Sequence, residues 1–468
     1  MLDHGLFHHH IVHFKHHSGT RDMTSGSIAK LVLLFSLPLM VGNIFQMLYN
    51  TVDVIVVGNF VSKQALAAVG STTMIVNIAV FFFNGFSVGA GVTIGQYFGA
   101  KDMEKLHTAV ETTMALTFVF CVFFTLAGTA LVGPLLHLMA TPEDVFQDAS
   151  TYLTIYFWGI SGLLIYNMGS GILRAVGNSF VPLVFLALTS ILNILLDLFF
   201  VISLHAGIAG VAYATILSQF ISAVLVLVML LRTKEVYRLS IRDLRIDRKT
   251  AGQIFAVALP AGLQSIITSV SNVFVQSYVN YFGSSCMAGW SCYNKLNQFI
   301  MLPMQSMAMA AATFVSQNIG AKKEERANRG TFVILGLTLS VTAVIAAALF
   351  AFAAPAVGLF TPDSSVIRFG VLFLRANVFF LLCNCVNHVL AGALRGGGDA
   401  RTPMLIMLSC FVLLRQAYLF ITTHFIANLP VLVGLGYPVG WTACCVIEFA
   451  YFCRKWRKSR GYSNSATS

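Results

Sequence analysis

Long apolar segments separated by short polar ones make up most of the chain from residue 28 onward. Apolar stretches of about 20 residues or more are each enough to cross a hydrocarbon layer roughly 30 Å thick as a helix. The pattern predicts an all-α integral membrane protein with twelve transmembrane helices. The expected spans are residues 28–57, 66–98, 107–133, 147–172, 181–204, 207–231, 252–281, 286–316, 330–354, 366–393, 402–425 and 431–453.

The second half of the chain repeats landmarks of the first. Leu-Arg-Ala-Val-Gly-Asn at residues 173–178 returns 221 positions later as Leu-Arg-Gly-Gly-Gly-Asp at residues 394–399. The same offset carries Gln96 onto Gln317. Six spans separate the copies, so both halves enter the membrane in the same direction and are related by an axis along the membrane normal. We therefore expect two pseudo-symmetric six-helix bundles.

This duplication divides the chain into five parts. Residues 27–231 form an N-lobe with helices 1 to 6, and residues 251–455 form a C-lobe with helices 7 to 12. A cytoplasmic linker, residues 232–250, joins them, and a basic cytoplasmic tail occupies residues 456–468. Residues 1–26 are a His-rich leader, which we expect to be disordered or misassigned, with Met23 as an alternative start.

Composition and charge fit a membrane protein. Of all residues, 57% are hydrophobic and 10% are charged, whereas about 25% charged is usual in soluble proteins. The expected loops place 24 of the 29 Lys and Arg residues on one side. Because basic loops stay in the cytoplasm, both termini are expected there, in a multi-pass protein of the bacterial inner (plasma) membrane. The net charge of +11 is thus a topology signal and does not indicate a nucleic-acid partner.

Acidic residues inside the spans need a reason, because an ionised aspartate at a helix centre costs about 2.5 to 3.5 kcal/mol. Fifteen of the 18 acidic residues fall in loops, termini or helix ends, and only Asp53, Asp197 and Glu448 lie inside spans. Asp53 ends a stripe with Asn43, Gln46 and Asn50 along one side of the first helix. Asn193 precedes Asp197 by one turn on the fifth helix, and Thr215 begins a polar stripe with Gln219 and Ser222 on the sixth.

If these stripes converge, two carboxyls, an amide and a hydroxyl form an oxygen-rich site for a small cation or a proton. Two carboxyls this close would share a proton and titrate as one unit. The alternative is that the polar groups only bridge helices by hydrogen bonds. Glu448 lies one turn from the basic tail and is expected at the membrane interface.

The second half lacks these acids. The positions equivalent to Asp53 and Asp197 are Val275 and Tyr418. Basic residues stand in the spans instead, and each either faces a cavity, neutralises an aspartate across it or extends to the interface. These residues are Lys295, Arg375 and Arg415.

The chain resembles multidrug and toxic compound extrusion (MATE) transporters, of the DinF-like and MepA-like branch. The resemblance rests on motifs that follow one another in the same order: Tyr-Asn-Thr-Val-Asp at 49–53, Gln-Tyr-Phe-Gly-Ala at 96–100, Leu-Arg-Ala-Val-Gly-Asn at 173–178, Asn-Ile-Leu-Leu-Asp at 193–197, Gly-Ile-Ala-Gly at 207–210 and Gln-Asn-Ile-Gly-Ala at 317–321. It implies two six-helix lobes around a central cavity that opens alternately to each side. It also implies that inward movement of H⁺ or Na⁺ drives drug exit.

The resemblance implies roles for individual residues. The family's cation-coupling site falls on Asp53, Asn193, Asp197 and Thr215. Tyr152 and Asn167 are looser matches. Together with polar residues of the stripes, they give the expected substrate cavity: Gln46, Asn50, Tyr152, Asn167, Gln264 and Lys295. No cofactor is expected, and no metal ion other than Na⁺ at the coupling site.

We therefore expect a monomeric secondary antiporter that exports organic, cationic compounds in exchange for H⁺ or Na⁺. A flippase for lipid-linked oligosaccharides or lipids is the alternative, and it requires more cationic residues around the cavity. A membrane-embedded enzyme or receptor would need a catalytic constellation or a soluble output domain. Neither is visible in the sequence, so we expect a protein that is not an enzyme.

Overall fold

The computed structural model describes residues 20–139 and 141–465, and it contains helices and no strands over these residues. Each expected span is one helix or a run of helical segments. The first half consists of α1 (Ile28–Phe60), α2 (Lys63–Gly99), α3 (Met103–Leu138), α4 (Glu143–Ala175), α5 (Phe180–Leu198) with the π-helical η1 (Phe199–Ser203), and α6 (Gly207–Arg232).

The second half is more interrupted. It begins with α7 (Arg248–Asn280), α8 (Ser284–Gly320), α9 (Glu324–Ala351) and the short α10 (Ala353–Gly358). The tenth span joins α11 (Ser364–Asn377), η2 (Val378–Phe380) and α12 (Leu381–Gly396). The eleventh joins α13 (Arg401–Leu408), η3 (Ser409–Leu414), α14 (Arg415–Ile421) and η4 (Thr422–Ile426), and the last contains α15 (Pro430–Gly434) and α16 (Gly436–Ser465).

Eleven of these spans are long and apolar enough to cross a membrane, counted over the described residues. The twelfth is α4, whose 33 residues give a length of about 50 Å at 1.5 Å per residue. It is more polar because it carries Tyr152, Tyr166 and Asn167. The predicted twelve-helix architecture is therefore confirmed.

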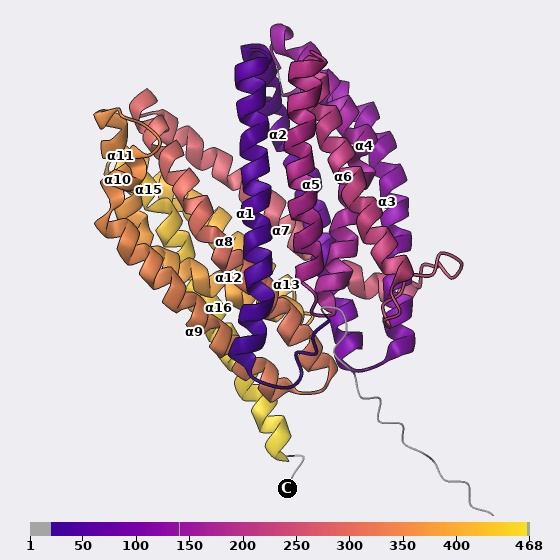
Figure 1. Cartoon of the computed structure of the whole chain (residues 1–468). Coiled ribbons are helices and arrows are strands. Elements are labelled where there is room, and N and C mark those ends of the chain that lie inside the picture. Colours follow the sequence, from indigo (N-terminus) through magenta and orange to yellow (C-terminus); the bar gives the residue numbers. More distant parts are fainter. Residues whose placement is uncertain (1–19, 140, 466–468) are drawn as a thin grey trace, which may run out of the picture.

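The two halves form bundles that approach each other at one end. In Figure 1, α1 to α6 and α7 to α16 lie closest near the C terminus and diverge toward the opposite end. Contacts between the halves run from α2 to both α7 and α8, and from α1 to α8. We call the end where the halves meet the closed end; the ends of α2, α4, α8 and α12 lie there.

Turns at the closed end repeat the same backbone geometry in both halves. Gly177 and Gly398 have φ values of 82° and 88°, which glycine adopts without steric penalty. The next residue of each motif caps the following helix: Asn178 Oδ1 accepts from Val181 N at 3.2 Å, and Asp399 Oδ1 accepts from Thr402 N at 3.2 Å. The duplication seen in the sequence is thus a duplication of local structure.

The chain before α1 packs against both halves at the closed end. Residues 1–19 lie outside the described residues, but residues 21–26 have defined contacts, so the expectation of disorder is wrong for them. Arg21 N donates to Val176 O at 3.2 Å in the first half. Met23 N donates to Gln317 Oε1 at 2.9 Å in the second, and the Met23 side chain is fully buried.

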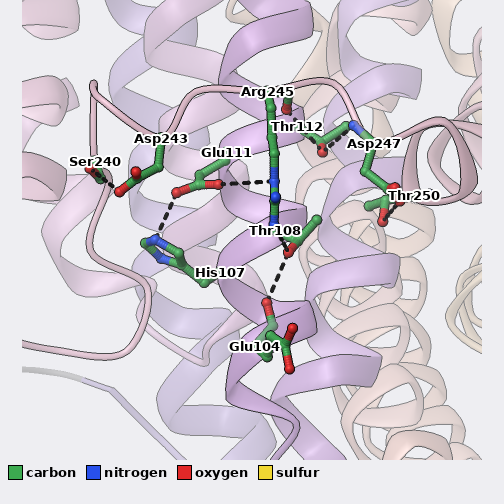
Figure 2. A network of polar contacts seen from close by, with 10 residues as sticks. All are labelled: Glu104, His107, Thr108, Glu111, Thr112, Ser240, Asp243, Arg245, Asp247 and Thr250. Atoms are coloured by element: carbon green, nitrogen blue, oxygen red, sulfur yellow. Dashed lines mark hydrogen bonds and ion pairs between the residues drawn. The ribbon is translucent and has the colours of Figure 1, made fainter.

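The linker between the halves is anchored on α3. Figure 2 shows the linker crossing α3 near Glu111 and Thr112, with the Arg245 side chain extending along the helix toward Thr108. Thr112 Oγ1 donates to Arg245 O at 3.3 Å and accepts from Asp247 N at 3.2 Å. Glu111 is 1% exposed and lies 2.7 Å from His107 Nε2 and 4.0 Å from Arg245 Nε. The sequence predicts a helix-end position for Glu111, but the side chain is buried and anchors the linker.

Candidate functional site

A cavity of about 490 Å³ lies between the two halves. Most of its wall comes from α1, α2, α4, α5 and α6, and the remainder comes from α7, α8 and α12. Its polar lining includes Asn43, Gln46, Asn84, Asn167, Arg174, Asn193, Thr215, Gln219, Gln305, His388 and Arg395. Both halves therefore contribute side chains to one compartment.

Asp53 and Asp197 lie together beside this cavity. Asp53 comes from α1 and Asp197 from α5, and their carboxyl groups are close enough for a hydrogen bond when one of them carries a proton. Asp197 is fully buried. Oδ1 of Asp53 and both carboxyl oxygens of Asp197 are buried and find no donor among the described residues. We call these two residues the carboxyl pair.

The other residues predicted for the coupling site, Asn193 and Thr215, both line the cavity. Asn193 lies one turn before Asp197, is 2% exposed and lines the cavity. Its side-chain oxygen and nitrogen are also without partners among the described residues. Thr215 lines the cavity, and its hydroxyl donates to Val211 O at 3.0 Å, which leaves the oxygen free to accept. Tyr152 lies within electrostatic range of both aspartates.

The predicted substrate residues separate into two groups. Gln46 and Asn167 line the cavity. The other four do not belong to its lining: Asn50, Tyr152, Gln264 and Lys295. Gln264 Nε2 lies 2.6 Å from Met407 Sδ, and Lys295 is exposed with its Nζ 5.7 Å from the ring centre of Phe360.

Arg375 and Arg415, the other basic residues predicted inside spans of the second half, are also absent from the cavity lining. The guanidinium of Arg375 lies 5.5 Å from the ring centre of Phe350. Arg415 is 2% exposed, donates to Ser271 Oγ at 2.6 Å and lies over the ring of Tyr437. Aromatic rings and a hydroxyl thus contact these cations, rather than an aspartate across the cavity.

Sequence reasoning missed the charged residues that do line the cavity. Arg174 and Arg395 are equivalent in the repeat and lie in the last turns of α4 and α12. The sequence signal for them is their repetition at matching helix ends. The same repetition is equally typical of basic residues in cytoplasmic loops, so it does not predict that they line a cavity. Glu448, expected at the interface, is instead fully buried, and Cys444 Sγ is 3.7 Å from its Oε2.

The cavity is shut at the closed end by close contact between α2 and α8. A Cβ atom at Gly99 would overlap the carbonyl of Gln317, and one at Gly320 would overlap the carbonyl of Gln96. The backbones of the two halves touch here because both positions lack a side chain. A compartment bounded by two bundles, shut at one end, is the geometry that alternating access requires.

Comparison with known proteins identifies the family. A family model named MatE matches residues 38–199 and 260–421, one segment in each half. The chain belongs to the MatE family. This membership confirms the resemblance to multidrug and toxic compound extrusion transporters and makes the chain a multi-pass membrane transporter.

Curated relatives align over most of their length. The "Probable multidrug resistance protein YpnP" of Bacillus subtilis is 30% identical over 436 residues, which cover 93% of this chain and 97% of the relative. The "Probable multidrug resistance protein YoeA" of the same organism is 25% identical over 449 residues, or 94% of this chain and 97% of the relative. The "Multidrug export protein MepA" of Staphylococcus aureus is 21% identical over 374 residues and 80% of this chain.

Solved structures share the fold. One described as the outward-facing conformation of a multidrug resistance MATE family transporter superposes with a TM-score of 0.88. It is 22% identical in sequence, and the match covers 94% of this chain and 98% of that one. The twelve-helix arrangement of the MatE family is therefore the arrangement of this chain.

Proposed function

We propose that this chain is a secondary antiporter that exports organic, cationic compounds in exchange for H⁺ or Na⁺. The observation that supports it is the carboxyl pair, whose buried oxygens lack donors and lie beside a cavity between two bundles. Buried carboxylates in a membrane need a proton, a cation or a partner. The relatives named as multidrug resistance proteins support drug-like cargo.

The ion would act on the two helices that carry the carboxyl pair. A proton shared by Asp53 and Asp197 removes one negative charge and adds the missing donor. Na⁺ would instead use oxygens of the carboxyl pair, Asn193 and Thr215, the hard ligands that such cations accept. Either event would change the charge that α1 and α5 carry beside the cavity. The cargo and the ion would compete for that charge.

The energy available is sufficient to move such an equilibrium. One elementary charge that crosses 100 mV releases about 2.3 kcal/mol. We propose that the protein lies in a bacterial inner membrane. Both termini would lie in the cytoplasm, because the basic loops gather at the closed end. We propose a monomer, since one chain supplies both bundles and the whole cavity lining.

Asp197→Asn tests the proposal. In inverted vesicles, ethidium transport is measured under a pH gradient and, separately, under a Na⁺ gradient. The variant should abolish transport driven by the coupling gradient, because an amide can neither gain a proton nor carry the charge. Asp144→Asn, an exposed residue of α4, is the matched control and should transport normally. Normal transport by folded Asp197→Asn would exclude coupling at this site.

Asp53→Asn and the double variant refine the test. If the two carboxyls act as one unit, the double variant should lose no more transport than either single variant. Residual transport in Asp53→Asn that disappears in the double variant would mean that Asp197 acts without Asp53. The equivalent positions in the second half hold Val275 and Tyr418, neither of which is acidic.

A second candidate function is a flippase for lipid-linked oligosaccharides. It is favoured by one observation: Arg174, Arg395 and His388 line the cavity, while no Asp or Glu of the described residues does so. Reconstitution with a labelled polyprenyl-linked sugar separates the two candidates. Movement of that lipid across the bilayer, without gradient-driven ethidium transport, would favour the flippase.

A further inference from the structure

The cavity ends between two arginines that the repeat makes equivalent. Arg174 lies in the last turn of α4, and Arg395 lies in the last turn of α12. Both residues line the same cavity, from opposite halves. A basic residue in the last turn of a helix ordinarily offsets the helix dipole at its own carbonyls. Arg174 instead reaches another helix, where its Nη2 donates to Ser87 Oγ of α2 at 3.2 Å.

Neither guanidinium has an acidic partner in contact. Within the part of the chain that the structure describes, no carboxylate oxygen lies within 4.0 Å of Arg174 or Arg395. Arg395 Nε is buried and without a hydrogen-bond partner there. Glu448 is within electrostatic range of Arg395 but does not line the cavity. A guanidinium offers five donors, and Arg174 uses one of them for a protein contact.

Neighbouring side chains extend the same donor-rich surface. His388, Gly392 and Arg395 are spaced by four and three residues, which puts them on one face of α12, and all three line the cavity. Gly392 lets α12 approach α8, because a Cβ there would overlap the carbonyl of Ala308. This close packing fixes the face that carries His388 and Arg395 toward the compartment.

We propose that the Arg174–Arg395 end of the cavity binds an anionic group, a carboxylate or a phosphate, of the transported molecule. The inference rests on the proposed transport function and adds an acidic group to its cargo, so zwitterions are favoured over simple cations. A planar guanidinium pairs with such groups through two parallel hydrogen bonds. The anion also supplies the counter-charge that two arginines inside a membrane protein need.

Binding of one dye in two forms tests this. Rhodamine B carries a free carboxylate, and its ethyl ester is a simple cation of nearly the same shape. Fluorescence polarisation with the purified protein should give tighter binding of the acid than of the ester. Equal affinities for the two dyes in the wild type would overturn the proposal, and this comparison needs no variant.

Variants then locate the interaction. Arg174→Gln and Arg395→Gln should each weaken binding of the acid by about tenfold, as expected for a lost charge-assisted hydrogen bond, and leave the ester unchanged. Arg395→Lys should recover part of the loss, because it keeps the charge but not the paired donors. Arg401→Gln, exposed at the start of α13, is the matched control. An unchanged preference for the acid in both glutamine variants would refute the assignment.

Competitors distinguish the source of the anion. Displacement of the acid dye by benzoate supports a small-molecule carboxylate, and displacement by polyprenyl phosphate supports a lipid phosphate. Displacement by neither contradicts the site. Failure of the transport function would appear separately, as absence of gradient-driven export of the ester, while the binding preference could still be measured.

Discussion

Gln96 and Gln317 make the same hydrogen bond in opposite directions across the closed end. Gln96 Nε2 donates to Gly396 O at 3.2 Å, and Gln317 Nε2 donates to Ala175 O at 2.8 Å. The acceptors are equivalent positions of the repeat, just as the donors are. The pair therefore joins the two halves through the internal symmetry axis and holds α2 and α8 at the ends of α12 and α4.

Loss of the Gln317 side chain should loosen the closed end more than loss of Gln96. Gln317 also accepts from Met23 N at 2.9 Å, so Gln317→Ala leaves two buried groups unpaired, at about 1 to 3 kcal/mol each. Faster hydrogen exchange of backbone amides 21–26 and 317–323 is the expected result. Gln276→Ala, half-buried and bonded within its own helix, should change nothing. Equal protection in the Gln317 and Gln276 variants would contradict this role.

Gly99→Ala should prevent closure. The new Cβ would overlap the backbone carbonyl of Gln317, which cannot rotate away as a flexible side chain could. We expect the variant to fold with α2 and α8 apart at this end and to lose gradient-driven dye export. Gly336→Ala, with no atom within 4 Å of the new Cβ, is the control. Normal export by Gly99→Ala would show that this contact is not required.

Met23→Ala should destabilise the closed end, although Met23 precedes the first helix. The side chain is fully buried in a core cluster that includes residues of α8 and α9, and truncation of a buried methionine costs about 2 to 5 kcal/mol. Thermal unfolding of the purified protein should begin at lower temperature. Met287→Ala, 37% exposed, should have little effect. A similar shift for both variants would argue against specific packing of Met23.

Asp399→Asn should lower the free energy of unfolding near neutral pH but not at acidic pH. Burial raises the pKa of Asp399, but hydrogen bonds from Tyr451 and Thr402 and the charge of Lys455 outweigh it, so the pKa lies below its ordinary value. A carboxyl with a lowered folded pKa adds stability above its unfolded pKa of about 3.9 and loses it as pH falls through the folded value. The helix cap survives in the variant, since Asn178 caps the equivalent turn.

Chemical unfolding across pH measures this difference. Wild type should be more stable than Asp399→Asn near neutral pH, through the contact with Lys455 Nζ at 3.2 Å. The difference should shrink as pH falls below about 4, because the carboxyl is then protonated first in the unfolded chain and, at lower pH, in the folded protein. A difference that does not vary with pH would assign the effect to packing.

The sequence alone determined the membrane spans, the duplication and the residues of the carboxyl pair. Hydrophobic length fixes a span because every backbone group must be satisfied within its own helix in lipid. Asp53 and Asp197 stood out because a charge inside a span has a large free-energy cost that a neutral residue avoids. Helical spacing also placed Asn193 on the side of Asp197, and this residue does line the cavity.

Only the tertiary structure decided which polar residues share a compartment. Gln46 and Asn50 lie on the same side of α1, yet only Gln46 lines the cavity. Spacing gives the face of a helix but not its neighbour or its depth, which depend on contacts far apart in sequence. For the same reason Lys295 was predicted in the cavity and Arg174 and Arg395 were not. The arginines at the helix ends reach the cavity because the two bundles meet there, through contacts such as Gly99 with Gln317.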